Sequence, residues 1–175
     1  MERSSSNGFS LVETVIALGV LTTGILGAAA VFATGMQNLS SSPDDVITTQ
    51  KAAQAIEAVF SARDTGTLTW AQIKNVSQSG VFLDGPQPLK LPGPDGLVNT
   101  SDDTTVETVV FPGRDQIIGT SDDQIVVLAS FTREIKIQDV PNENGEVRSI
   151  VVTIKYQSGS TKRTYTLTTY ISAFA

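Results

Sequence analysis

The chain has 175 residues, a formal net charge of −6, and neither cysteine nor histidine. Without cysteine there is no disulfide framework or thiol chemistry. Without histidine, the commonest general base and the commonest metal ligand are both missing. We therefore expect a protein that is not an enzyme. Hydrophobic residues make up 40% of the chain and charged residues 17%, which fits a folded domain rather than a disordered one.

The negative charge is concentrated in the middle of the chain. Residues 84–123 contain eight acidic and two basic residues, so this segment alone carries −6 and the remainder balances to zero. Nucleic-acid binders show a basic stripe or patch instead. No nucleic-acid partner is therefore predicted.

The N-terminal part combines a polar segment, residues 1–8, with a long apolar run. Residues 14–43 contain no Asp, Glu, Lys or Arg, and a membrane-spanning helix needs only about 20 mostly apolar residues. Glu13 stands at the start of this run. A carboxylate within reach of lipid is costly and is treated by default as functional. The sequence predicts a membrane helix that carries one functional acid.

The border of the apolar run carries a specific motif, Gly8-Phe9-Ser10-Leu11-Val12-Glu13. It resembles the class III signal of type IV pilins and of the pseudopilins of type II secretion, in which Gly-Phe-Thr-Leu-Ile-Glu is typical. The resemblance implies that a prepilin peptidase cuts between Gly8 and Phe9 and that the new amino group of Phe9 is methylated. It also implies that Glu13 contacts the Phe9 amine of a neighbouring subunit. A paired charge is tolerated in a low-dielectric interior, whereas an unpaired one is heavily penalised.

The apolar run narrows the resemblance. Residues 18–27 look like the membrane segment of the minor pilins called type IV pilus modification protein (PilV), and are also similar to minor pseudopilin I. Major pilins commonly carry a proline in this segment, but residues 9–37 contain none, which favours a minor subunit. The implied partners are other pilin or pseudopilin subunits, the prepilin peptidase, the inner-membrane assembly platform and the membrane itself. The implied location is the bacterial inner membrane as a precursor, with a cytoplasmic N-terminus and a periplasmic globular domain, and then the pilus or cell surface.

The helix that follows is expected to pack on a sheet. Ser42 suits an N-cap, Pro43 a first helical position and Asp44 the positive end of the helix dipole, so a kink or break is predicted near residues 40–43. The apolar stripe over residues 43–63 has helical spacing and comprises Ile47, Ala52, Ala55, Ile56, Val59 and Phe60. The expected division is a leader (1–8), a transmembrane assembly helix (9–39), an amphipathic second half (43–63) and a β-rich globular domain (64–175).

Two segments in the acidic region repeat without gaps, residues 92–103 and 112–123. They share Pro, Gly, Asp, Thr, Ser, Asp and Asp in register, and Asn99 aligns with Gly119. Asn and Gly best tolerate a positive φ, so both copies are predicted to form the same tight loop. The alternation in residues 104–111 predicts a strand between them.

The chemistry of these loops suits a hard cation. Calcium takes six to eight oxygen ligands from carboxylates and carbonyls. The sequence therefore supports the hypothesis that calcium binds to the acids of both repeats, with the alternative that the loops are solvated turns, where Asp and Gly are common for backbone reasons. The candidate ligands are Asp95, Asp102, Asp103, Asp115, Asp122 and Asp123.

The C-terminal part predicts an antiparallel meander. Residues 125–128, 131–140, 147–156 and 161–171 are rich in Val, Ile, Thr and Tyr, and residues 142–145 and 157–160 are turn sequences. The predicted fold is α+β and pilin-like, with a long N-terminal helix packed on this sheet. The predicted function is a minor type IV pilin that primes assembly or sits at the filament tip. The alternatives are a minor pseudopilin of type II secretion and a membrane-anchored calcium-binding or adhesion module without a filament.

Overall fold

The computed structural model describes residues 10–158 and 161–174, except for the side chains of residues 37–42. The chain divides into two compact units, Met1–Ser42 and Pro43–Ala175. The predicted cleavage residues Gly8 and Phe9 lie outside the described residues. Each unit is described by itself.

One helix, α1, runs from Leu11 to Asp64 and enters both units. Pro43 lies inside it rather than at the start of a separate helix, so the helix-start signal at Ser42 does not begin a new element. Proline lacks the N–H that a helix interior requires, which removes one hydrogen bond with the preceding turn. The division between the two units nevertheless falls between Ser42 and Pro43, where the sequence predicted a kink.

The part of α1 in the first unit has the composition of a membrane segment. Leu11–Met36 is apolar and long enough to cross a membrane, as an anchor or a signal sequence would be, and none of it is buried within the chain. Its threonine hydroxyls donate to backbone carbonyls of the preceding turn: Thr22 donates to the carbonyl of Leu18 at 2.9 Å and Thr34 to that of Ala30 at 2.9 Å. Polar side chains satisfied in this way are compatible with a lipid environment.

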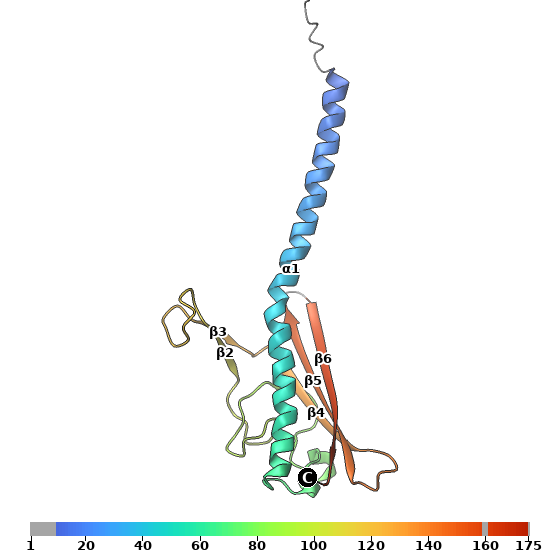
Figure 1. Ribbon diagram of the computed structural model, residues 1–175, viewed down its shortest axis with the longest axis vertical. Coiled ribbons are helices and arrows are strands. Elements are labelled where there is room, and N and C mark those ends of the chain that lie inside the picture. Colours follow the sequence, from blue (N-terminus) through green and yellow to red (C-terminus); the bar gives the residue numbers. More distant parts are fainter. Residues whose placement is uncertain (1–9, 159–160, 175) are drawn as a thin grey trace, which may run out of the picture. The chain divides into compact units, whose positions relative to one another are not determined.

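The second unit is built on a four-stranded antiparallel sheet in the order β1-β4-β5-β6 (Figure 1). Strands β4, β5 and β6 form the predicted meander, with Ile135 opposite Val152 and Val152 opposite Leu167. The short strand β1 was not predicted. The bounds are β1 Gln87–Pro88, β4 Thr132–Asp139, β5 Val147–Ser158 and β6 Thr161–Ser172.

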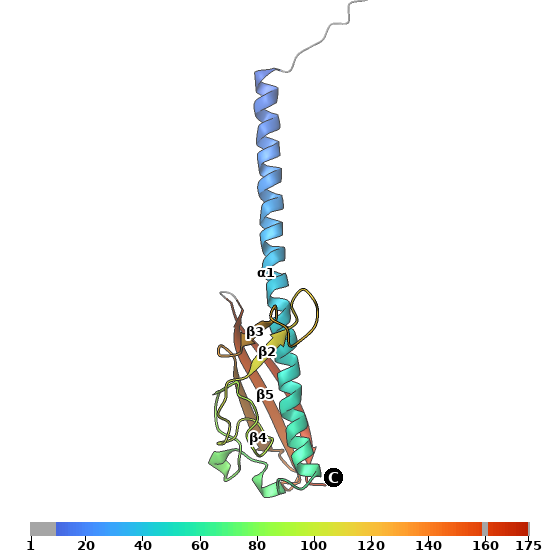
Figure 2. The ribbon, with the colours of Figure 1, turned by 90° about the vertical axis from the view of Figure 1, so that its left-hand side faces the viewer.

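The portion of α1 after Pro43 covers one face of this sheet, as Figure 2 shows. In β4, Arg133, Ile135 and Ile137 are buried, whereas Lys136 is exposed, as expected of a strand that is covered on one face. The predicted stripe on the helix contributes to the same core. The core residues from these elements include Ile47, Ala52, Ala55, Val59, Ile135, Ile137, Ile150, Val152 and Ile154.

A second, two-stranded sheet lies apart from the meander. It consists of β2 (Thr108–Phe111) and β3 (Gln124–Val127), which pair antiparallel. The sequence predicted a strand over 104–111, but β2 begins only at Thr108, because the N–H of Glu107 donates to the carbonyl of Leu89 at 3.0 Å instead. The sequence also placed 125–128 in the meander, which is wrong, because β3 pairs with β2. The two strands pair across the 112–123 loop, which is held closed by hydrogen bonds from the N–H groups of Gly113 and Thr120 to the carboxylate of Asp123.

The segment between α1 and β1 contains two 3-10 turns, η1 (Trp70–Gln72) and η2 (Val76–Gln78). The buried Asn75 between them bonds to the edge of β4: its Nδ2 donates to the carbonyl of Ile135 at 2.7 Å, and its Oδ1 accepts from the N–H of Ile137 at 2.8 Å. Asn75 therefore continues the sheet without a strand.

Candidate functional site

Glu13 lies in the first turn of α1 and is exposed. Its backbone N–H donates to the hydroxyl oxygen of Ser10 at 3.2 Å, so Ser10 caps the helix. Residues 10–43 contain no ionisable side chain besides Glu13. The site is therefore a single carboxylate beside an apolar surface, and in a low-dielectric environment it needs a cation from elsewhere.

The first acidic loop is organised around Asp103. Its carboxylate accepts the backbone N–H groups of Gly93 at 3.0 Å, Asn99 at 2.7 Å and Thr100 at 3.3 Å. These donors come from both ends of the repeat, so this one side chain draws the loop closed. Hydrogen bonds to an ionised carboxylate are stronger than neutral ones.

The second loop repeats this arrangement around Asp123. Its carboxylate accepts from the N–H groups of Gly113 at 3.4 Å, Gly119 at 2.6 Å and Thr120 at 3.2 Å. The donors are the residues that align with those of the first loop. The prediction that both repeats form the same tight loop is confirmed.

The preceding acid in each repeat binds a threonine. The hydroxyl of Thr100 donates to Asp102 at 2.6 Å and that of Thr120 to Asp122 at 2.7 Å. This bond is the main cause that lowers the pKa of each aspartate from its ordinary value, and partial burial opposes it. Both acids are thereby held in their charged form.

The remaining acids close a local turn. Asp95 accepts the N–H of Leu97 at 2.8 Å, and Asp115 accepts the N–H of Ile117 at 2.9 Å. Such bonds to a backbone N–H two residues ahead are typical of Asp turns. All six candidate calcium ligands therefore accept hydrogen bonds from their own loop.

Left-handed backbone occurs at the same places in both loops. The aligned residues Asn99 and Gly119 have φ values of 62° and 100°, as predicted from their residue types. A second aligned pair, Gly96 and Gln116, has φ values of 72° and 58°. Glutamine rarely adopts such a conformation, which is why the sequence did not reveal this second position.

The acids do not converge on a common point. Among the residues that the structure describes, no group of three or more acidic side chains is placed to hold a metal ion. The carboxylates are turned onto backbone N–H groups instead, so the loops have the right donor chemistry for calcium but not the arrangement of a cage. Calcium binding stays a prediction.

The first loop is anchored in the protein interior by a buried arginine. Arg133 of β4 is 1% exposed; its Nε donates to Oδ1 of Asn99 at 2.8 Å, and Asn99 Nδ2 donates to the carbonyl of Arg133 at 2.7 Å. Burial lowers the pKa of Arg133 to about 10, opposed by the negative charges of Glu107 and Asp103. The arginine remains charged at neutral pH and sits among acids that compensate it.

A second ionic group that the sequence did not reveal lies at the start of the second unit. Asp45 accepts from the hydroxyl of Tyr156 and from the Arg163 guanidinium at 2.9 Å. The tyrosine bond is the main cause that lowers the pKa of Asp45. The three residues are far apart in the sequence, so no local pattern could link them. Their contacts fix the first turns of this helical segment to β5 and β6.

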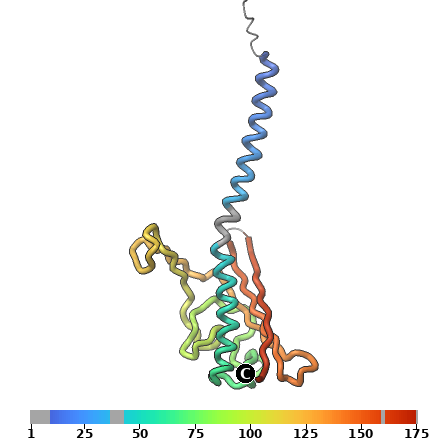
Figure 3. Tube along the Cα trace, viewed as in Figure 1, coloured from blue at the N-terminus to red at the C-terminus, as the bar shows by residue number. Residues whose placement is uncertain are grey.

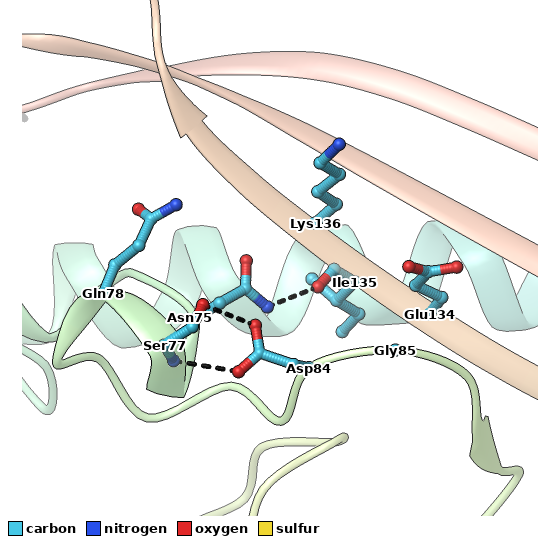
Figure 4. A pocket seen from close by; sticks show the side chains of 8 residues that line it. All are labelled: Asn75, Ser77, Gln78, Asp84, Gly85, Glu134, Ile135 and Lys136. Carbon is cyan, nitrogen blue, oxygen red and sulfur yellow. Dashed lines mark hydrogen bonds between the residues drawn. The ribbon is translucent and has the colours of Figure 1, made fainter.

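The pocket in Figure 4 is small, with a volume of about 130 Å³, and lies beside β4. Its polar groups include Asn75, already bonded to β4, and Asp84, whose carboxylate accepts from the backbone N–H and the hydroxyl of Ser77 at 2.8 Å each. Both therefore serve the fold. Glu134 and Lys136 complete the charged lining of the pocket.

Comparison with known proteins gives no further assignment. No family model, no curated protein and no solved structure matches this chain.

Proposed function

We propose that this chain is a minor type IV pilin, processed by prepilin peptidase and incorporated into a pilus filament through its N-terminal helix. The observation that carries the proposal is the position of Glu13. It stands in the first turn of a helix whose next 23 residues, up to Met36, are uncharged and apolar enough to cross a membrane. The motif Gly8-Phe9…Glu13 is in register with that border.

The layout of the second unit supports the same proposal. An antiparallel sheet packs on the helix after Pro43, as the pilin resemblance implies. The acidic loops lie on this unit and would be displayed by an assembled filament. The first unit then mediates incorporation into the filament, and the second unit forms the exposed surface of a subunit that primes assembly or sits at the tip.

The proposed role of Glu13 in assembly can be tested by mutation. When subunits stack, its carboxylate pairs with the amine of Phe9 from a neighbour, and the pair forms in one register. Removing one partner of a buried pair costs about 3–5 kcal/mol, which corresponds to more than a hundredfold in an association constant. Membrane insertion depends on the apolar helix and does not need this pair.

The test compares Glu13→Ala and Glu13→Gln with Val12→Ala as the matched control, each in cells that express the filament system. Both Glu13 variants should reach the membrane in normal amounts but fall by at least tenfold in sheared filaments. Val12→Ala should leave both quantities unchanged. Normal incorporation of Glu13→Ala at normal stoichiometry would refute the proposal.

The pseudopilin of a type II secretion system shares the same N-terminal motif and is the second candidate. The two differ in the machine that surrounds the chain. A retraction ATPase encoded nearby favours the pilus, whereas a secretin with exported enzymes favours secretion. A membrane-anchored module without a filament would instead keep its Met1 N-terminus.

A further inference from the structure

The two repeats share one loop conformation but have opposite surroundings. Leu97 and Val98 of the first repeat are 2% and 8% exposed, whereas the aligned Ile117 and Ile118 of the second are 60% and 65% exposed. Both dipeptides are apolar. In each, the backbone N–H of the first residue donates to the aspartate two positions earlier in the sequence. The second repeat therefore presents to solvent the side chains that the first repeat buries.

The rest of the second-repeat arm, which we define as residues 108–127, is also apolar on its outer side. Residues 109 and 111 of β2 pack against the core. On the opposite face, Val110 is directly across from Ile125, and Ile125 and Val127 are 67% and 55% exposed. A ribbon that is apolar on both faces, with one face uncovered, is typical of an interaction surface.

The first repeat shows which kind of surface covers such a loop. Its dipeptide enters the apolar core, and two basic side chains hold its rim: Lys90 Nζ donates to the carbonyl of Asp103 at 2.9 Å, and Arg133 holds Asn99. A receiving surface for the second repeat should accordingly combine a cavity for two aliphatic side chains with basic groups for the acids beside them.

The chain itself carries a pocket with such basic groups at one end of its sheet. A pocket of about 410 Å³ is lined by Lys155 of β5 and by Lys162 and Arg163 of β6. Lys155 lies opposite Thr164 in the sheet. We define this pocket as the basic pocket; its other lining residues are Ser130, Thr132, Tyr156, Gln157 and Thr164.

The charges of the two surfaces are complementary. The loop of the arm carries Asp115, Asp122 and Asp123 against Arg114, a net charge of −2. The basic pocket carries three positive side chains, of which Arg163 is paired with Asp45, leaving +2. Complementary charges favour encounter and fix register.

The loop at the tip of the arm lies away from β6 of its own chain. Figure 1 places β2 and β3 on one side of the helix and β6 on the other, and Figure 3 shows the loop of residues 112–123 at the far end of the arm. A contact between them therefore joins two different copies. It uses different patches on each copy, and such head-to-tail contacts propagate as rings or open helical chains.

We propose that the second-repeat arm docks into the basic pocket of a second copy of this chain, with Ile117 and Ile118 entering the pocket and the acids of the loop facing Lys155 and Lys162. The contact links copies head to tail. It does not rest on the proposed function, because the arm and the pocket both belong to the unit after Pro43.

Cysteine linking tests this contact, because the chain has no cysteine of its own. Two differently tagged full-length copies are mixed in detergent micelles, one with Ile118→Cys and the other with Thr164→Cys, under mild oxidation. The matched control replaces Thr164→Cys by Thr168→Cys, which is exposed on the same face of β6 but lies about 13 Å along the strand. We expect a linked heterodimer for Thr164→Cys at a yield at least tenfold above that of the control.

A charge reversal separates the contact from random collision. Lys155→Glu with Lys162→Glu in the receiving copy should reduce the yield at least tenfold. Equal yields at Thr164 and Thr168, an unchanged yield after the reversal, or preferential linking of Ile118→Cys to itself would each overturn the proposal. Linking of Ile118→Cys to another filament subunit in cells, with none to a second copy, would overturn it too.

A stability measurement serves as the second control. Ile117→Ser with Ile118→Ser should leave the melting temperature of the dilute protein unchanged and abolish association, because these side chains touch solvent in the single chain. The aligned change Leu97→Ser with Val98→Ser should lower the melting temperature by 10 °C or more. A large loss of melting temperature in the first variant would show that the arm serves the fold of its own chain and would overturn the proposal.

Discussion

Asp102 lies directly against Gly93: a methyl group added to Gly93 would stand 2.3 Å from Oδ2 of the carboxylate. The second repeat has the same relationship between Gly113 and Asp122, at 2.1 Å. The shared glycine of the repeat is therefore required by the acid that lies nine residues later in both copies, from 93 to 102 and from 113 to 122.

Gly93→Ala should destabilise the protein by about 1–3 kcal/mol, as overpacking of a close contact does. The cost has a steric origin, since Gly93 and Gly113 do not have the positive φ of Gly96 and Gly119. The measurement is urea unfolding of the variant against the wild type.

A double variant isolates this contact. Asp102→Ala alone removes the bonds to Thr100 and Asp95 and should destabilise, but the added cost of Gly93→Ala should vanish in its presence. In the corresponding cycle of Gly113 and Asp122 the cost should fall only in part, because the added methyl would also stand 2.5 Å from the backbone carbonyl oxygen of Asp122. Additive effects in both cycles would show that the carboxylate is not what excludes the side chain.

Arg133→Met should destabilise the protein by about 3 kcal/mol. It removes the bond to Asn99 and a buried positive charge near Glu107 and Asp103, although Glu107 keeps its ion pair with Lys51. Breaking a buried charge network is costly. Lys136→Met is the matched control on the exposed face of the same strand and should change the stability by less than about 0.5 kcal/mol. Similar losses for the two variants would contradict the anchoring role of Arg133.

Stability should fall in acid partly through Asp45. Its pKa is lowered in the folded protein, chiefly by the Tyr156 hydroxyl. A lowered folded pKa adds stability above the ordinary pKa of 3.8, and that stability is lost as the pH falls through the folded value.

Asp45→Asn should therefore show a shallower loss of melting temperature between pH 4 and pH 2 than the wild type. Some slope should remain, because the pKa values of Asp102, Asp122 and Asp139 are lowered as well. Identical pH profiles for the two proteins would contradict a charged Asp45 in this contact.

Calcium is tested by melting the protein with excess calcium and with chelator. Binding to the folded state alone raises stability by about 2.7 kcal/mol at a hundredfold excess over the dissociation constant. If calcium binds, the protein should melt at a higher temperature with calcium than with chelator, and the double variant Asp103→Asn with Asp123→Asn should abolish this difference. Equal melting temperatures for the wild type would exclude the calcium hypothesis, leaving the acids as closures of their own loops.

The sequence predicted the loops as far as local conformation allowed. Asn99 and Gly119 could be assigned a positive φ because few residue types tolerate it. The burial of Leu97 and the exposure of Ile117 could not be distinguished, since the two segments are equally apolar and the difference arises from distant packing.

The fold, too, was predicted only where local sequence patterns determine it. The segments rich in Val, Ile, Thr and Tyr indicated the strands of the meander, because these residue types favour strands. The pairing of β3 with β2, the bond between Asn99 and Arg133 and the contact of Asp45 with Tyr156 all join residues that no local pattern connects. The helix start predicted at Ser42 failed because one continuous helix accommodates Pro43.

Mass spectrometry of the mature protein from its native membrane would decide whether the proposed pilin processing takes place. We expect an N-terminal peptide that begins at Phe9 and carries a methyl group on its amine, with residues 1–8 absent. A mature protein that retains the Met1 N-terminus would contradict the proposal.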